Sequence, residues 1–164
     1  MNIRPAREAD FDTIADITNR TIATSAIHFG YEPVPVADLV ALWRGGKYPW
    51  LVADRDGVIA GYSKAGLWRE RAAYAWTCET TVYLAENERG RGVGRMLYSA
   101  LLDLLPGLGF HSAIGGITLP NPASVKLHLA LGFVSVGIVR EAGKKFDAWH
   151  DVEFFQKLFT AGGS

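Results

Sequence analysis

The sequence has 164 residues, of which 49% are hydrophobic and 21% charged, and its formal net charge at pH 7 is zero. These values are typical of one globular domain with a sizeable core, so we expect a single domain over residues 1–164. The even mixture of charges argues against a nucleic-acid partner, and no apolar run has the length of a membrane span. A charged N-terminal segment and a single cysteine, Cys78, predict a cytoplasmic protein without an internal disulfide.

Hydrophobic periodicity and turn residues predict strands and helices that alternate along the chain. We expect strands over residues 1–4, 50–53, 58–62, 112–119, 133–139 and 152–158, and an extended run over 74–85 that contains the central strand. We expect helices from a cap at Asp10 to Ile22, over 36–44, from near Gly92 to Pro106, and over 123–131. Residues 25–35 and 143–149 have the composition of loops. Because helices interrupt the strands throughout, the pattern favours one α/β domain with a mixed sheet.

The most informative segment joins the central strand to the next helix. It reads Arg89-Gly90-Arg91-Gly92-Val93-Gly94-Arg95, and a helical apolar face begins after it. A glycine-rich turn of this kind directs backbone N–H groups toward one point at the positive end of the helix dipole, where phosphate oxygens bind. Glycines let a ligand approach the backbone, and arginines pair with phosphate. The alternative is a structural turn with solvated arginines.

The spacing decides which phosphate ligand to expect. A dinucleotide fingerprint needs a further glycine where this chain has Arg95 or Leu97, and a P-loop needs a lysine after Gly94. The pattern is instead Arg-x-x-Gly-x-Gly. It resembles the acyl-CoA pyrophosphate loop of the GNAT N-acetyltransferase superfamily, which has Gln/Arg-x-x-Gly-x-Gly/Ala between a strand and a helix.

The resemblance covers nearly the whole chain. Residues 121–133, N-x-x-S-x-x-L-H-x-x-L-G-F, are similar to the second CoA-side motif of the superfamily. Residues 69–83, R-x-R-x-x-Y-x-x-T-x-E-x-x-V-Y, and 143–152, G-x-K-x-x-x-W-x-D-V, resemble the phosphinothricin and methionine sulfoximine N-acetyltransferase family, a GNAT branch. This resemblance implies a mixed, mostly antiparallel twisted sheet flanked by helices, acetyl-CoA as co-substrate without a metal, a small-molecule amine acceptor and a homodimer. Lys145, Trp149 and Asp151 belong to the pattern, with pocket closure and dimer contact both open as roles.

The resemblance assigns Glu79 the role of general base. An amine attacks a thioester only when it is neutral, and a carboxylate can take its proton directly or through water. The alternative is a surface ion pair with Arg69 or Arg71. His128 lies where many superfamily members carry a tyrosine that protonates the departing thiolate, and an imidazole could do this or share the base role. The alternative role for His128 is that of a core histidine bonded to a backbone carbonyl. In the family a glutamate usually follows this histidine, whereas this chain has Leu129.

Further candidates lie on the coenzyme side. A backbone N–H freed by a splay or bulge at Val82-Tyr83-Leu84 would stabilise the oxyanion and pair with the pantetheine amides. Asn121 could bond the pantetheine arm and also cap the helix before Pro122. Ser124 is a weaker candidate, with a plain surface position as its alternative.

On the acceptor side, Arg69 and Arg71 could clamp a substrate carboxylate by bidentate bonds or lie at a solvated hairpin end. Phe29 and Tyr31 would wall the pocket or anchor their loop, and Thr81 is a further candidate. We therefore expect acetyl transfer to the α-amine of a small amino acid analogue such as phosphinothricin or methionine sulfoximine. The alternatives are acetylation of a polyamine, an antibiotic or a protein N-terminus, or a non-catalytic CoA-binding module.

Overall fold

The structure is a computed structural model that describes residues 1–160; the last four residues of the expected 1–164 domain lie outside the described residues. The strands are β1 (Asn2–Pro5), β2 (Trp50–Arg55), β3 (Val58–Leu67), β4 (Thr77–Leu84), β5 (Ser112–Thr118), β6 (Val134–Lys145) and β7 (Ala148–Leu158). The helices are α1 (Phe11–Thr24), α2 (Val36–Gly45), α3 (Val93–Leu104) and α4 (Pro122–Ala130). Short 3-10 helices lie at Glu8–Asp10, Ala72–Tyr74, Glu86–Glu88 and Pro106–Leu108. None of the helices in residues 1–160 is long and apolar enough to cross a membrane.

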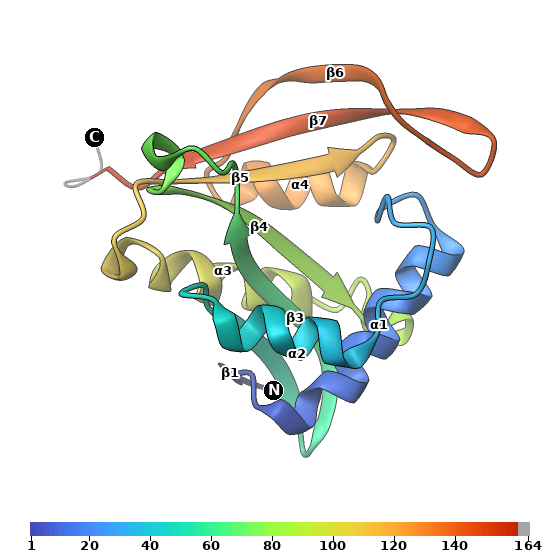
Figure 1. Ribbon diagram of the computed structural model, residues 1–164, viewed down its shortest axis with the longest axis vertical. Coiled ribbons are helices and arrows are strands. Elements are labelled where there is room, and N and C mark those ends of the chain that lie inside the picture. Colours follow the sequence, from blue (N-terminus) through green and yellow to red (C-terminus); the bar gives the residue numbers. More distant parts are fainter. Residues whose placement is uncertain (161–164) are drawn as a thin grey trace.

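The strands form one 7-stranded sheet in the order β1-β2-β3-β4-β5-β7-β6 (Figure 1). All neighbours pair antiparallel except β4 and β5, which are parallel. A parallel pair needs a crossover connection, and α3 supplies it. The expected mixed, mostly antiparallel sheet flanked by helices is confirmed.

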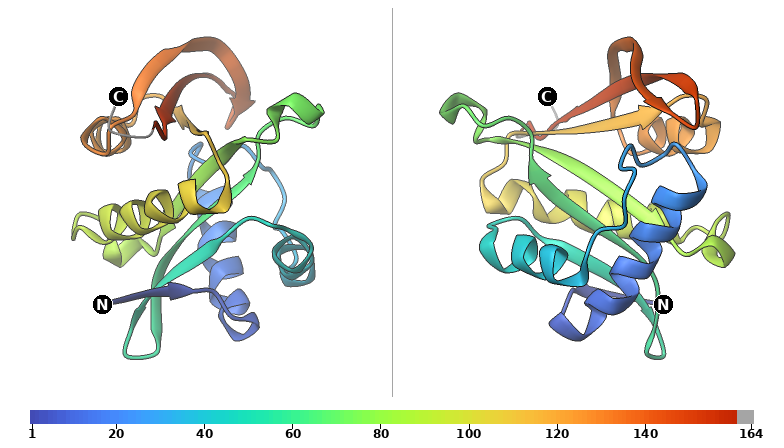
Figure 2. Two further views of the ribbon diagram at one scale, coloured as in Figure 1. Left: turned by 90° about the vertical axis from the view of Figure 1, so that its left-hand side faces the viewer. Right: turned by 45° about the vertical axis from the view of Figure 1, so that its right-hand side comes forward.

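The helices cover both faces of the sheet (Figure 2). Successive strand side chains point to opposite faces, so Trp50 and Val52 of β2 pack with α1 and α2, whereas Leu51 and Ala53 pack with α3. On α1 the residues that recur at helical spacing, from Phe11 to Ile22, are buried against the first face. The two apolar clusters therefore lie on either side of the central strands, and β4 contributes side chains to both.

Three segments differ from the sequence-based expectation. The strand expected over residues 58–62 continues to Leu67 as β3. Residues 72–74 form a 3-10 helix, and β4 begins only at Thr77 rather than at residue 74. Residues 143–149, expected to be a loop, are mostly strand: β6 and β7 continue to the pair Lys145–Ala148. The turn between them needs two residues at positive φ, and Phe146 (φ +52°) and Asp147 (φ +56°) adopt it without a glycine or proline to signal it.

Candidate active site

The strands β4 and β5 diverge in the middle of the sheet. They pair only at Thr77–Ser112, Cys78–Ala113 and Glu79–Ile114, although β4 continues to Leu84 and β5 to Thr118. Figure 1 shows the two strands separating beyond this point. We call the opening the wedge; its vertex is at Glu79. Backbone groups on the β5-facing edge of residues 80–84 have no ladder partner there, so an extended ligand could pair with them as an added strand.

The glycine turn, residues 89–94, lies between the end of β4 and the start of α3. Gly90 (φ +75°) and Gly92 (φ +81°) adopt left-handed conformations that favour glycine, and Gly92 caps α3. No atom lies within 4 Å of the point that a Cβ would occupy at either glycine. The first N–H groups of α3 lack partners within the helix and carry its positive dipole end. This open turn therefore has the features of a site for phosphate oxygens.

The arginines of the glycine turn are exposed, whereas Val93 at the start of α3 is buried. Arg89, Arg91 and Arg95 are exposed, and among residues 1–160 none of them takes part in an ion pair. Val93 is buried under the turn, and Gly94 lies in ordinary contact with Leu84. The arginines are therefore free to meet an anion, whereas Val93 fixes the helix to the core.

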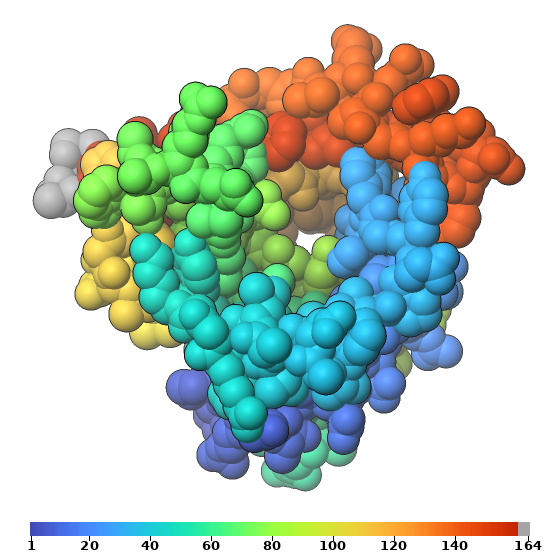
Figure 3. All heavy atoms as spheres, in the orientation of Figure 1, coloured from blue at the N-terminus to red at the C-terminus, as the bar shows by residue number. Residues whose placement is uncertain are grey.

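Strand β4 presents its side chains alternately to the two faces of the sheet. Cys78, Val82 and Leu84 belong to the apolar cluster of α3 and α4, and Tyr83 packs in that of α1 and α2. Glu79 and Thr81 share the phase of Tyr83 and therefore face the α1–α2 side. Figure 3 shows a hollow on this side, bordered by α2, the loop after α1, the β3–β4 connection and the β6–β7 hairpin.

The environment of Glu79 favours a proton acceptor. Its side chain is exposed, yet the surrounding protein disfavours the charged form and raises the pKa of the carboxyl above 4.5, with the positive charge of Lys64 acting in the opposite direction. Among residues 1–160 Glu79 forms no ion pair with Arg69 or Arg71. A carboxylate with a raised pKa is a stronger base, and such groups gather at active sites.

His128 lies on the opposite face, buried between α3, α4 and β5. Its Nδ1 is 2.8 Å from the Ser124 carbonyl oxygen and its Nε2 is 3.0 Å from the Tyr98 hydroxyl, which is 2.6 Å from the hydroxyl of Thr80. With Nδ1–H donating to the carbonyl, Nε2 accepts from Tyr98 and Tyr98 accepts from Thr80. Burial lowers the pKa of His128, which keeps the ring neutral. This is the arrangement of a core histidine, and its chain of hydroxyls ends beside the vertex of the wedge.

Asn121 and Ser124 begin α4. The side-chain oxygen of Asn121 accepts from the Ser124 N–H at 3.2 Å, so Asn121 is the N-cap, with Pro122 at the first helical position. Ser124 is half-buried and its carbonyl oxygen accepts from His128. Both residues thus have structural partners, and they begin a helix that packs on the same side of the sheet as α3.

The 25–35 loop is held against the tip of the β6–β7 hairpin. The Tyr31 hydroxyl donates to the Lys144 carbonyl oxygen, and the Phe29 ring lies over Gly143, where a Cβ would come within 2.4 Å of it. The His28 ring lies 5.9 Å from that of Tyr83 on β4, measured between centroids. Phe29 and Tyr31 therefore anchor the loop, and the loop borders the hollow.

Lys145 fixes the same loop from inside. It is buried, and its ammonium donates to the carbonyl oxygens of Ile22 (2.6 Å), Ser25 (2.8 Å) and His28 (2.6 Å). Three donors thus meet three acceptors at the negative end of the α1 dipole.

Arg69 and Arg71 lie at the rim, in the β3–β4 connection, and both are exposed. The Arg69 guanidinium lies 4.8 Å from the Trp68 ring, and Trp68 packs edge-on against Phe154. Sequence reasoning missed Lys64, whose ammonium lies 4.8 Å from the Trp50 ring. The sequence did contain a sign of it, because Lys64 is the single charged residue in the mainly apolar strand β3.

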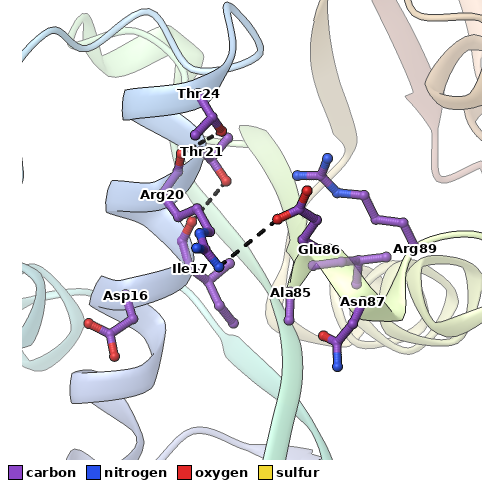
Figure 4. Close-up of a pocket in the computed structure, with 10 residues that line it drawn as sticks. Asp16, Ile17, Arg20, Thr21, Thr24, Ala85, Glu86, Asn87 and Arg89 are labelled. Atoms are coloured by element: carbon purple, nitrogen blue, oxygen red, sulfur yellow. Dashed lines mark hydrogen bonds and ion pairs between the residues drawn. The ribbon is translucent and has the colours of Figure 1, made fainter.

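A separate cavity of about 790 Å³ lies between α1 and the end of β4 (Figure 4). Arg20 and Glu86 approach to 4.0 Å across it, and Arg89 lines its edge. Because this pair is exposed, it contributes little to stability. Leu84 and Arg89 line this cavity, but Glu79 and residues 90–95 do not.

Residues 3–153 match the family model described as an acetyltransferase (GNAT) domain. The chain belongs to the GNAT superfamily. It is 44% identical over 163 residues to a phosphinothricin N-acetyltransferase of Streptomyces viridochromogenes, covering 97% of this chain and 88% of that protein. It is 34% identical to an L-methionine sulfoximine/L-methionine sulfone acetyltransferase of Salmonella typhimurium, covering 95% of this chain and 93% of the relative. The predicted family is therefore confirmed.

Solved structures of GNAT proteins have the same fold as this chain. A phosphinothricin acetyltransferase from Sinorhizobium meliloti in complex with acetyl-CoA superposes with a TM-score of 0.91 at 32% identity, covering 96% of this chain and 87% of that one. A Salmonella typhimurium protein solved with its cofactor acetyl-CoA gives a TM-score of 0.96 at 32% identity, covering 100% and 96%. This GNAT chain is thus an acetyl-CoA-dependent N-acetyltransferase. Its open glycine turn and unpaired β4 edge fit that coenzyme, and no cluster of metal-binding side chains occurs in residues 1–160.

Proposed function

We propose that this enzyme acetylates the α-amine of a small amino acid analogue such as phosphinothricin or methionine sulfoximine, with Glu79 as general base. The observation that carries the proposal is the coincidence of the wedge vertex with Glu79: the last β4–β5 pair is Glu79–Ile114. A thioester held along the β4 edge would end beside this carboxylate. The names of the relatives supply the substrate class.

The coenzyme would be held by the glycine turn and the β4 edge. Backbone N–H groups of residues 90–94 and the arginines at 89, 91 and 95 would bind its diphosphate. The backbone of residues 82–84 would pair with the pantetheine amides, and Asn121 and Ser124 would flank that arm. The coenzyme supplies an acetyl group activated as a thioester. An unpaired N–H on the same edge would stabilise negative charge on the carbonyl oxygen.

The acceptor would enter from the hollow. Glu79 accepts a proton from its ammonium group, directly or through water, and so frees the lone pair for attack. Arg69 and Arg71, exposed at the rim, would bind the carboxylate by paired hydrogen bonds. Thr81 lies on the same face of β4 as Glu79, and Phe29 and Tyr31 would close the opposite wall.

For His128 the contacts favour a positioning role. Both ring nitrogens already have partners, so the ring would hold Tyr98 and Thr80 beside the vertex rather than transfer a proton itself. The direct role as acid for the thiolate stays a prediction. His128→Gln separates the two roles by acetyl-CoA affinity. Loss of a positioning residue lowers that affinity together with turnover, whereas loss of a proton donor lowers turnover and leaves the affinity unchanged.

The test is a thiol-release assay with acetyl-CoA and a panel of amines: phosphinothricin, methionine sulfoximine, ordinary amino acids, polyamines and aminoglycosides. We expect the amino acid analogues to react fastest. Glu79→Gln should lower turnover by about 100-fold or more with acetyl-CoA affinity unchanged. Preference for polyamines or aminoglycosides would overturn the substrate class, and loss of acetyl-CoA affinity in Glu79→Gln would make Glu79 structural. Tight acetyl-CoA binding without turnover on any amine would favour a CoA-binding module.

We also propose a homodimer in the cytoplasm, as the family resemblance implies. Strand β6 is an edge of the sheet with exposed apolar residues, among them Val134, Val136 and Ile138. Light scattering after size exclusion tests the dimer, since a monomer at micromolar concentration would contradict it.

A further inference from the structure

Lys64 faces the hollow from the strand next to Glu79. It pairs with Thr81 across β3 and β4, while Gly66 pairs with Glu79, so all four positions share one face of the sheet. The Lys64 side chain is half-buried, and its ammonium lies over the Trp50 ring at 4.8 Å. Among residues 1–160 no carboxylate lies within 4.0 Å of this ammonium. A sheltered cation without an anionic partner is uncommon in proteins.

The charge of Lys64 acts on both walls of the hollow. It opposes the rise in the pKa of Glu79 on β4, and together with Lys145 it lowers the pKa of His28 on the 25–35 loop, where burial is the main cause. This agrees with the geometry: Lys64 pairs with Thr81 on the face of Glu79, and its half-buried side chain holds the ammonium over the Trp50 ring.

A second cation lies on the other side of Glu79. Along β3 the residues on this face are Lys64 and Gly66, and the strand ends at Leu67. Trp68, whose ring carries the Arg69 guanidinium, follows directly after the strand and is at most about 14 Å of extended chain from Lys64. At Gly66, opposite Glu79, no atom lies within 4 Å of the point that a Cβ would occupy. The space above the base is thus open and flanked by two cations.

We propose that Lys64 binds a second anionic group on the acceptor, so that the preferred substrates are amino acids with an acidic side chain, a carboxylate or a phosphinate. This inference rests on the proposed function and narrows it. The amine lies at Glu79, the α-carboxylate meets Arg69, and the side-chain anion meets Lys64. An acceptor with a neutral side chain, such as methionine sulfone, leaves the ammonium unpaired.

The test compares acceptors matched in shape but not in charge: glutamate with glutamine, and phosphinothricin with methionine sulfone. The variants are Lys64→Met and Lys64→Arg, with Lys47→Met, an exposed lysine on the β2 side, as the control. A charge-assisted hydrogen bond predicts that Lys64→Met lowers kcat/KM for the acidic acceptors by about 10- to 100-fold and changes the neutral ones less than about twofold. Lys64→Arg should retain part of the preference, and Lys47→Met should behave as the parent.

Three results would overturn the inference. Equal loss on acidic and neutral acceptors would mean that Lys64 acts only through Glu79. Loss on every amino acid but not on an amine without a carboxylate would place the α-carboxylate at Lys64. Unchanged kcat/KM for all acceptors in Lys64→Met would mean that Lys64 does not contact the acceptor. Calorimetry measures the binding of glutamate and glutamine to the parent and to Lys64→Met, and so tests the same preference without turnover. If no acetyl transfer occurs, the proposed reaction is refuted, but the binding preference still tests the role of Lys64.

Discussion

The Tyr98 hydroxyl lies 3.0 Å from Nε2 of His128, and the other ring nitrogen meets the Ser124 carbonyl oxygen at 2.8 Å. A neutral imidazole has one donor and one acceptor, and these two contacts use both. An added proton on Nε2 would face the Tyr98 oxygen in a buried site, where a positive charge is costly. The contact therefore links α3 to α4 through a histidine that stays neutral.

This contact predicts lower stability in acid. In the unfolded chain His128 binds a proton below a pH of about 6.5, whereas burial lowers the pKa of the folded group. The unfolded state then binds more protons, so the free energy of unfolding is greatest above about pH 6.5 and falls as the pH drops toward the folded pKa. Urea unfolding from pH 7.5 to 5 measures the slope. His128→Asn should be less stable throughout but show a shallower slope, and His28→Asn should act in the same direction because the pKa of His28 is also lowered.

The control is Leu97→Ala, which removes a buried apolar side chain and no titrating group. It should lower stability at every pH and keep the slope of the parent. An unchanged slope in His128→Asn would show that the folded ring titrates as it does in the unfolded chain.

The pH dependence of the reaction should report Glu79. The base must be ionised, so kcat/KM falls as the pH drops through the pKa of Glu79, which lies above 4.5. We expect Glu79→Gln to lose this acid limb, and its residual rate to rise with pH as more of the free amine becomes neutral. Initial rates with saturating acetyl-CoA measure both profiles. An acid limb that persists in Glu79→Gln would assign it to another group.

The glycine turn predicts a selective loss of coenzyme binding. Gly92 adopts φ +81°, and an alanine there costs about 1–2 kcal/mol of backbone strain and places a methyl group in the open turn. We expect Gly92→Ala to weaken acetyl-CoA binding, measured by calorimetry, by about tenfold with the fold retained. Gly109→Ala is the matched control, because Gly109 also has a positive φ (+95°), has no neighbour within 4 Å of the added Cβ and lies outside the site. Equal affinity in the two variants would remove the turn from the coenzyme site.

Lys145 predicts a coupling between stability and acceptor binding. Lys145→Met leaves three carbonyl oxygens without their charged donor, and we expect the free energy of unfolding to fall by about 2–4 kcal/mol. Because the 25–35 loop loses its anchor, KM for the acceptor should rise while acetyl-CoA affinity stays close to that of the parent. Lys144→Met is the control, since Lys144 is exposed and its ammonium lies over the Trp149 ring. If Lys145→Met and Lys144→Met had the same free energy of unfolding and the same KM for the acceptor, Lys145 would not anchor the loop.

Some features of this enzyme follow from residues that are adjacent in the chain. The glycine turn was predicted because left-handed conformations favour glycine and a helix start exposes N–H groups, both of which are local properties. The cap at Asn121 followed from the same kind of reasoning. The end of β6 was missed because the tight turn at Phe146 and Asp147 contains neither glycine nor proline, and the long pairing of β6 with β7 holds it in place.

The sequence alone therefore determined the superfamily, the order of helices and strands and the position of the glycine turn. The tertiary structure decided that the wedge opens at Glu79, that His128 is enclosed by Tyr98, that Lys145 meets the end of α1, and that Lys64 shares a face with the base. Lys145 and Ile22, for example, are 123 positions apart. Such contacts depend on strand register and on which face each side chain takes. A shift of one residue in pairing would move the strand side chains Glu79, Lys64 and Lys145 to the other side of the sheet.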